Sequence, residues 1–421
     1  MTLAFAIAGA GATPPIRQAA SAASPDVLLG LFVLFVAAKL GEEVARRLGQ
    51  PAVVGELLGG VIVGPFALGW AQLTEPAAVF SEFGVVILLF AVGLKVRIDD
   101  LLAVGRPAAL TAVIGMLLPI AGGYAVGVAI GYPSASAIYV GLALAATSIG
   151  ITSRVLAELG VLDRKFSRVI LGAAVIDDIL VLIAIGVVEG FTTGDTSTSA
   201  IGLVISAIGL LGLGFLAARR ARGLPREVFT WPRFAETPLV VAFIFMFGMA
   251  LVSAYLGLAA IIGAFVAGLI IAETEAREEI EHEIRPLSVI FTPFFFAFTG
   301  AQLDLRTLTD PAIVALVVAL ILVGVITKTI GGLIGAWSTG RWSATTIGFG
   351  MSPRGEVGIV VANLGLASGL LSQTSFSAVL VAVIGTTIVA PYLLAFAIPR
   401  AIREESERDT NSAPGPRAAP A

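Results

Sequence analysis

Long apolar runs recur along the chain, and short connections between them carry most of the charged residues. Many of these runs approach the roughly 20 residues that a helix needs to cross a bilayer. The pattern predicts an all-α polytopic membrane protein with about thirteen transmembrane helices. The expected ranges are 26–48, 51–70, 79–96, 105–130, 134–158, 166–190, 199–218, 239–256, 258–274, 284–302, 311–338, 342–369 and 373–399.

The two ends of the chain differ from this transmembrane domain of residues 26–399. We expect residues 1–25 to form an N-terminal extracytoplasmic segment. Residues 400–421 are charged and then rich in Pro and Ala, a composition typical of a disordered tail, which we place in the cytoplasm.

Composition supports the membrane assignment. Of the 421 residues, 57% are hydrophobic and only 13% are charged, whereas soluble domains carry about 25% charged residues. The absence of cysteine excludes disulfides, thiol catalysis and cysteine metal sites. Small residues let membrane helices approach closely, so the pairs Gly60/Gly64 and Gly331/Gly335 predict helix contacts.

The basic residues give the orientation. Alternate connections, starting after the first helix and including the tail, carry 22 of the 26 lysines and arginines. Cytoplasmic loops hold an excess of these residues. We therefore expect a multi-pass protein of the cell inner (plasma) membrane, with its N-terminus outside and its C-terminus in the cytoplasm.

Two aspartates and a lysine lie deep inside predicted helices. Asp177 and Asp178 are about halfway along range 166–190, where an ionised side chain costs at least about 2.5–3.5 kcal/mol. Lys328 is too far from either end of its helix to reach the membrane surface. The aspartate pair is its obvious counter-ion. A purely structural salt bridge, or polar contacts between helices, are the alternatives to a functional site.

Two stretches interrupt the helical pattern. ATSIGITSR at 146–154 includes Thr147 and Ser148, and MSPRGEVG at 351–358 includes Arg354 and Glu356. Proline and glycine weaken helices, so both stretches predict local unwinding. The alternatives are hydroxyls bonded to their own helix at the first stretch and an Arg354–Glu356 pair that holds the second together.

The two interruptions occupy corresponding positions seven helices apart. Because seven is odd, the corresponding helices run in opposite directions and form an inverted repeat. Interrupted helices at matching places in such repeats indicate a transporter binding site near the membrane midplane.

Five stretches of the chain resemble the monovalent cation:proton antiporter-2 superfamily, and most closely its NapA-type sodium/proton antiporters. They are ATSIGIT, ILGAAVIDD, LGLAAIIGAFVAG, FFFAFTGAQLDL and MSPRGEVG. The resemblance covers about residues 26–399. It implies the NhaA-like fold, in which two broken helices cross inside a core domain and a separate domain forms a homodimer. The implied ranges are core helices at about 105–190 and 311–399, dimer and scaffold helices at about 26–96 and 239–302, and a linker helix at about 199–218.

The same resemblance implies roles for the singled-out residues. Asp178 is the ion- and proton-binding carboxylate, and Asp177 is the partner of Lys328. Thr147 and Ser148 lie at the first crossover, where they support Asp178 in holding Na⁺. Arg354 and Glu356 lie at the second crossover, which they support.

The expected function is therefore secondary active Na⁺/H⁺ antiport by alternating access, serving Na⁺ export and pH homeostasis. If Lys328 also releases and takes up a proton, two H⁺ exchange for one Na⁺ and the cycle is electrogenic. Potassium/proton antiport is the alternative, and Li⁺ is a further possible cargo. The expected partners are these monovalent cations, protons, membrane lipid and a second copy of the chain, with no cofactor, enzymatic activity or nucleic acid. A channel, an intramembrane aspartyl protease and an ATP-driven pump fit the residues less well, and no GxxxxGK[ST] motif is present.

Overall fold

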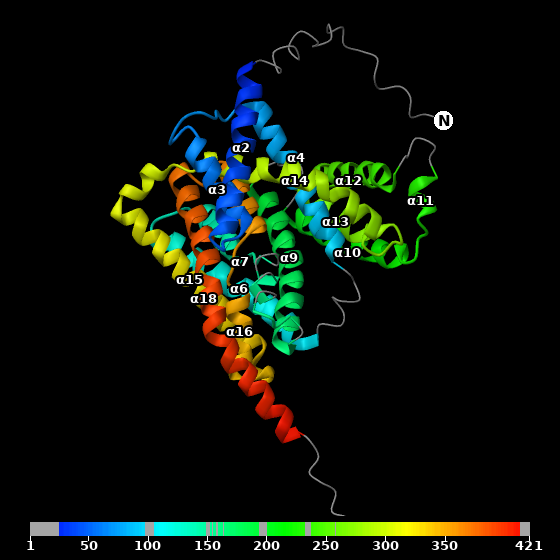
Figure 1. The fold of residues 1–421 in the computed structure, drawn as a ribbon, viewed down its shortest axis with the longest axis vertical. Coiled ribbons are helices and arrows are strands. Elements are labelled where there is room, and N and C mark those ends of the chain that lie inside the picture. Colours follow the sequence, from blue (N-terminus) through cyan, green and yellow to red (C-terminus); the bar gives the residue numbers. More distant parts are fainter. Residues whose placement is uncertain are drawn as a thin grey trace, which may run out of the picture.

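A computed structural model describes residues 25–96, 105–148, 152–153, 155–156, 159–162, 164–192, 200–231, 237–256 and 258–412. This part of the chain is helical and contains no strand (Figure 1). Every range expected from the sequence contains helical residues. Seven of the described helices are long and apolar enough to cross a membrane, which confirms an all-helical, polytopic architecture. The expected segment 1–25 and the end of the tail after 412 lie outside the described residues, except for Pro25.

One group of helices packs mainly against its own members. Helix α14 contacts α2, α3, α4 and α12, while α13 contacts α4 and α12. The members are α2 (Pro25–Arg47), α3 (Ala52–Val63), α4 (Glu75–Lys95), α12 (Pro238–Tyr255), α13 (Ala260–Ile271) and α14 (Arg277–Ala301).

A second group packs around α6, α15 and α18. Helix α6 packs against α7, α9 and α15, and α18 packs against α15, α16 and α17. The members are α6 (Gly105–Ala129), α7 (Ser134–Ala145), α9 (Lys165–Thr192), α15 (Pro311–Gly335), α16 (Arg341–Gly350), α17 (Glu356–Ala367) and α18 (Gln373–Ser412). Helix α10 (Ala200–Ala221) contacts both groups, through α13 and α9. The remaining short elements are α11 (Glu227–Thr230), η1 (Leu305–Thr309) and η2 (Trp337–Thr339).

The two expected glycine pairs mediate close helix packing. Gly60 lies against the Ala297 backbone of α14, and Gly331 lies against the Gly115 backbone of α6. A methyl group at either glycine would collide with the facing backbone, so the smallest residue is required for these contacts. Gly64 and Gly335 are placed in the same way, and the packing prediction is confirmed.

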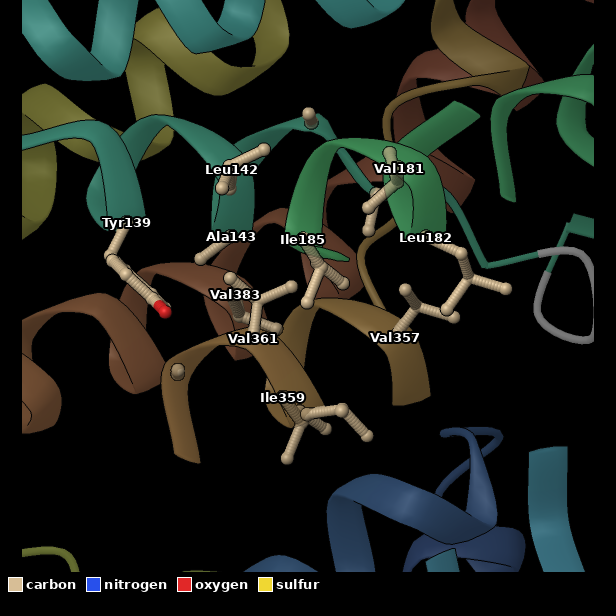
Figure 2. Packing of buried hydrophobic residues seen from close by; sticks show 14 of the residues in the cluster. Tyr139, Leu142, Ala143, Val181, Leu182, Ile185, Val357, Ile359, Val361 and Val383 are labelled. Carbon is tan, nitrogen blue, oxygen red and sulfur yellow. The ribbon is translucent and has the colours of Figure 1, made fainter. Parts of the chain in front are cut away.

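Apolar side chains from separate helices meet around the interrupted segments. Figure 2 shows Ile185 of α9 between Val357 and Val361 of α17, with Ala143 of α7 and Val383 of α18 on the side of Val361. All five are buried. This packing holds α17 against α7 and α18, and α7 against α9, the helix that carries both aspartates.

Three boundaries differ clearly from expectation. Helix α3, expected to reach residue 70, ends at Val63, because Gly64 and Pro65 follow and a proline does not continue a helix at low cost. The tail from residue 400 was expected to be disordered, but α18 continues through it as far as Ser412. The extension is held in place because Glu404 and Glu405 accept hydrogen bonds from the starts of α16 and α9. Helix α14 begins at Arg277 rather than near 284. Acidic residues are favourable in a first helical turn, and Glu279 there also pairs with Arg226.

Candidate functional site

Helix α9 carries both predicted aspartates into the centre of the second helix group. Asp177 is fully buried and Asp178 is only 4% exposed. Neighbouring residues on a helix point about 100° apart. The two carboxyl groups can therefore serve different partners from one helix.

Lys328 reaches Asp177 from α15. Its Nζ donates to Asp177 Oδ2 over 2.9 Å, and both side chains have no exposed surface. The predicted contact is therefore present. Gly115 of α6 lies beside the lysine, where a Cβ would make ordinary van der Waals contact at 3.7 Å from Cδ and 3.8 Å from Nζ.

The same carboxylate oxygen also binds a hydroxyl. Thr147 Oγ1 donates to Asp177 Oδ2 over 2.7 Å and lies 3.2 Å from the Met351 carbonyl oxygen. Asp177 Oδ1 has no hydrogen-bond partner among the residues that the structure describes. Asp177 is thus anchored through one oxygen, while the other faces the interior without a described donor.

Both predicted interruptions are present, and they touch. Helix α7 ends at Ala145 and residues 146–148 are not helical, while residues 351–355 separate α16 from α17. The Ser148 N–H donates to the Pro353 carbonyl over 2.9 Å. Thr152 Oγ1 donates over 2.8 Å to the carbonyl of Gly350, the last residue of α16, which adds a second link next to the first. We refer to residues 146–148 as the first break and residues 351–355 as the second break.

Gly355 allows the breaks to approach. A Cβ at Gly355 would lie 2.5 Å from Ser148 Oγ, closer than real Cβ atoms come to other atoms. Irregular backbone inside a membrane must be satisfied by protein or by a water-filled cavity. Here the first break donates hydrogen bonds to backbone carbonyls of the second, from the Ser148 N–H to Pro353 and from the Thr147 hydroxyl to Met351.

Arg354 binds carbonyl oxygens around the second break. Its guanidinium donates to Ser352 over 2.6 Å, to Met351 over 3.2 Å and, across to α15, to Gly324 over 3.0 Å. The Arg354 carbonyl accepts from the hydroxyl of Thr387 in α18. The break is therefore fixed to two neighbouring helices through one fully buried residue.

Glu356 is the first residue of α17, directly after the second break. Its side chain lies outside what the structure describes, so the Arg354–Glu356 pair stays a prediction. The acceptors described for Arg354 are backbone carbonyls. The sequence pattern identified Arg354 but gave no indication of the Gly324 carbonyl, because backbone acceptors leave no trace in residue type.

The donor set suits a small hard cation. Carboxylate, hydroxyl and carbonyl oxygens are the ligands that such cations prefer. Within the described residues, no group of three or more His, Cys, Asp or Glu side chains comes together. The two aspartates, Lys328 and Arg354 are all buried, and Lys328 interacts electrostatically with both aspartates while Arg354 does so with Asp177. Replacing a proton by a monovalent cation there leaves the total charge unchanged.

Comparison with known proteins covers most of the chain. The model of the family described as sodium/hydrogen exchanger, transmembrane, matches residues 30–398. The chain is 38% identical to the high-affinity Na⁺/H⁺ antiporter NhaS3 of Synechocystis sp., over 90% of this chain and 91% of that protein. It is 35% identical to the Na⁺/H⁺-K⁺ antiporter GerN of Bacillus cereus, over 86% of this chain and 94% of that protein.

The fold is also similar to a solved structure. The sodium proton antiporter MjNhaP1 from Methanocaldococcus jannaschii at pH 8 superposes with a TM-score of 0.67 at 19% identity. The match covers 90% of this chain and 99% of that one. It shows that the two chains share a helical membrane fold.

Proposed function

The chain belongs to the sodium/hydrogen exchanger family, a family of transporters rather than enzymes, and on this premise we propose that it exports Na⁺ in exchange for H⁺ by alternating access. The observation that carries the proposal is the buried cluster at the two breaks. A lysine and an aspartate lie 2.9 Å apart there, with a second aspartate adjacent in sequence. Such intramembrane charges mark ion pathways.

Each site residue then has a separate role. Asp178 is the carboxylate that binds either Na⁺ or H⁺. Asp177 holds Lys328, and Thr147 and Ser148 supply oxygen or backbone groups at the first break. Arg354 and Glu356 support the second break. The described contacts of Thr147 and Arg354 with break residues support this division.

Exchange follows from the cost of moving a bare charge. A carboxylate without a partner is expensive to carry through an apolar barrier, whereas the same group with a proton or Na⁺ bound is much cheaper. If Asp178 accepts one or the other but never both, the site changes sides only when loaded. Alternating exposure then couples Na⁺ movement to H⁺ movement in the opposite direction.

We further propose a NapA-type architecture with thirteen spans and an NhaA-like inverted repeat. In it, the helix group around α9 and α15 is the moving core, and the group around α14 is the scaffold through which two copies form a homodimer. Helix α10 is the linker. The protein lies in the cell inner membrane with its N-terminus outside, and it serves pH homeostasis as well as Na⁺ export.

The proposed stoichiometry is two H⁺ for one Na⁺. Na⁺ binding draws on Asp177 as well as Asp178, so Lys328 loses its partner and releases its proton. Burial favours this release, because it disfavours a charged ammonium. The return step carries one proton on Asp178 and one on Lys328, and one net charge moves in each cycle.

Potassium/proton exchange is the second candidate, since GerN is named for K⁺ as well as Na⁺. Purified protein in ATP-free liposomes, given a pH gradient, tests both candidates. We expect Na⁺ or Li⁺ to dissipate the gradient and K⁺ to have little effect. A response to K⁺ alone would select the potassium exchanger, and no response to any cation would refute antiport.

A further inference from the structure

The helical extension of α18 beyond the last apolar span ends against two other helices. Glu404 in this extension accepts three backbone hydrogen bonds at the start of α16: from Arg341 and Trp342 over 2.8 Å, and from Ser343 over 3.0 Å. The first N–H groups of a helix have no partner within the helix. Helix α16 has no side-chain cap of its own, since its N-cap residue is Gly340. The cap comes from α18 instead.

Glu405, the next residue, does the same for a second helix. Its Oε1 accepts from the Phe166 N–H at the start of α9 over 3.4 Å, and its Oε2 lies 3.9 Å from Arg164. Glu405 is only 8% exposed. Two consecutive glutamates therefore place negative charge at the N-terminal ends of two helices, where the helix dipole favours it.

The local backbone is adapted to this arrangement. Gly340 has φ +117°, a conformation that L-residues rarely adopt, and a Cβ there would lie 2.6 Å from the Glu404 carboxylate. Arg400, one turn earlier in α18, stacks 5.1 Å from the ring of Trp342. Figure 1 shows α18 running past α16 toward its C-terminal end. The contact thus extends over more than one turn of α18.

Both capped helices lead to the proposed ion site. Helix α9 carries the two aspartates. Helix α16 has ten residues, or about 15 Å at 1.5 Å per residue, and its far end supplies the Gly350 and Met351 carbonyls bonded by Thr152 and Thr147. A short rigid helix transmits a tilt at one end to the other, so its N-terminal anchor affects the position of these carbonyls.

We propose that Glu404 and Glu405 are positioning residues, which hold α16 and α9 in register at their N-terminal ends and so set the geometry of the two breaks. This inference rests on the proposed Na⁺/H⁺ exchange for its kinetic effect but not for its structural effect. The glutamates do not contact the ion. They act through the helices that do.

The test uses the full chain in two measurements. Glu404→Gln and Glu405→Gln remove one negative charge each, and Glu407→Gln, at an exposed position of the same helix, is the matched control. In proteoliposomes, we measure the half-saturating Na⁺ concentration and the maximal exchange rate. In detergent, we measure hydrogen–deuterium exchange at the backbone amides of residues 341–343 and at those of Ser148 and Met351.

We expect both variants to raise the half-saturating Na⁺ concentration about fivefold, the effect of losing a charge worth about 1 kcal/mol at a helix N-terminus, while Glu407→Gln leaves it unchanged. In Glu404→Gln, amide exchange should accelerate at residues 341–343 and also at Ser148 and Met351. Faster exchange confined to 341–343, with Na⁺ dependence unchanged, would show that the glutamates only anchor the extension and would overturn the proposal.

A second variant and the amide exchange data separate failure of this proposal from misfolding and from failure of the proposed function. If Glu404→Gln does not fold, Glu404→Asp retains the charge on a shorter side chain and should give the same changes at smaller size; wild-type values in this variant overturn the proposal. If wild-type protein shows no Na⁺/H⁺ exchange, the proposed function fails. The amide exchange of Ser148 and Met351 still decides whether the glutamates position the breaks.

Discussion

Removing Lys328 tests the energetic role of the buried ion pair most directly. Lys328 and Asp177 have no exposed surface and their charged atoms lie 2.9 Å apart. In Lys328→Ala, Asp177 keeps the hydrogen bond from Thr147 but loses its only described cationic donor. A buried charge left without its partner costs about 3–5 kcal/mol. We therefore expect a loss of this size in the free energy of unfolding.

The expected change in melting temperature follows from chain length. Unfolding entropy of about 2.1 cal/mol/K per residue, as for soluble proteins, gives about 0.9 kcal/mol/K for this chain. A loss of 3–5 kcal/mol then lowers Tm by about 3–6 °C. The assay is thermal unfolding of purified protein in detergent. Thr329→Ala is the control, because its hydroxyl bonds only to the Val325 carbonyl of the same helix among the described contacts.

The double variant Asp177→Asn/Lys328→Ala separates the pair from the rest of the site. Once the carboxylate is neutral, losing the lysine no longer leaves an unpaired charge. We expect the double variant to be destabilised less than the summed single losses, with a coupling free energy of about 0.5–3 kcal/mol, as for residues in direct contact. Strictly additive losses, or a Lys328→Ala protein as stable as Thr329→Ala, would refute a stabilising ion pair.

Three further predictions concern transport. Asp178→Asn should fold, because an amide is cheaper to bury than a carboxylate, yet lose Na⁺-driven proton flux; flux equal to that of an exposed control, Asp26→Asn, would remove Asp178 from the ion site. An imposed membrane potential should drive Na⁺ movement without a pH gradient, with about 2.3 kcal/mol per 100 mV for one net charge; exchange rates and end-points that ignore voltage would mean one-to-one exchange. Gly355→Ala should lower stability by about 1–3 kcal/mol and impair exchange, because the new methyl group collides with Ser148; a loss no larger than in Gly248→Ala, where the space is open, would contradict close contact between the breaks.

The centre of the site could be predicted from sequence because charges inside a membrane have few acceptable environments. Lys328 had to find a carboxylate, and the adjacent pair Asp177 and Asp178 lies halfway along its own helix. The breaks were equally predictable, since Pro353 and Gly355 cannot continue a regular helix at low cost. In each case a local property of the residue restricts the tertiary structure.

The extension of α18 could not be predicted by the same means. Residues such as Glu404, Glu405 and Arg403 read as a solvated, flexible tail when only composition is considered. Their helical state depends on tertiary partners, the unpaired N–H groups at the starts of α16 and α9. Nothing in residue type indicates which distant backbone groups will lie nearby. Contacts between a side chain and a distant backbone group are for this reason the hardest to predict from sequence.

That dependence on backbone also bears on how the site tolerates mutation. Arg354 is held by the carbonyls of Gly324, Met351 and Ser352, and no side-chain substitution deletes a carbonyl. Lys328 and Asp177, by contrast, depend on each other's side chains. A substitution at either Lys328 or Asp177 therefore constrains the residue at the other position. The contacts of Arg354 depend on only one side chain, its own. Side chains around the second break can therefore change during evolution, while the backbone carbonyls that bind Arg354 are retained.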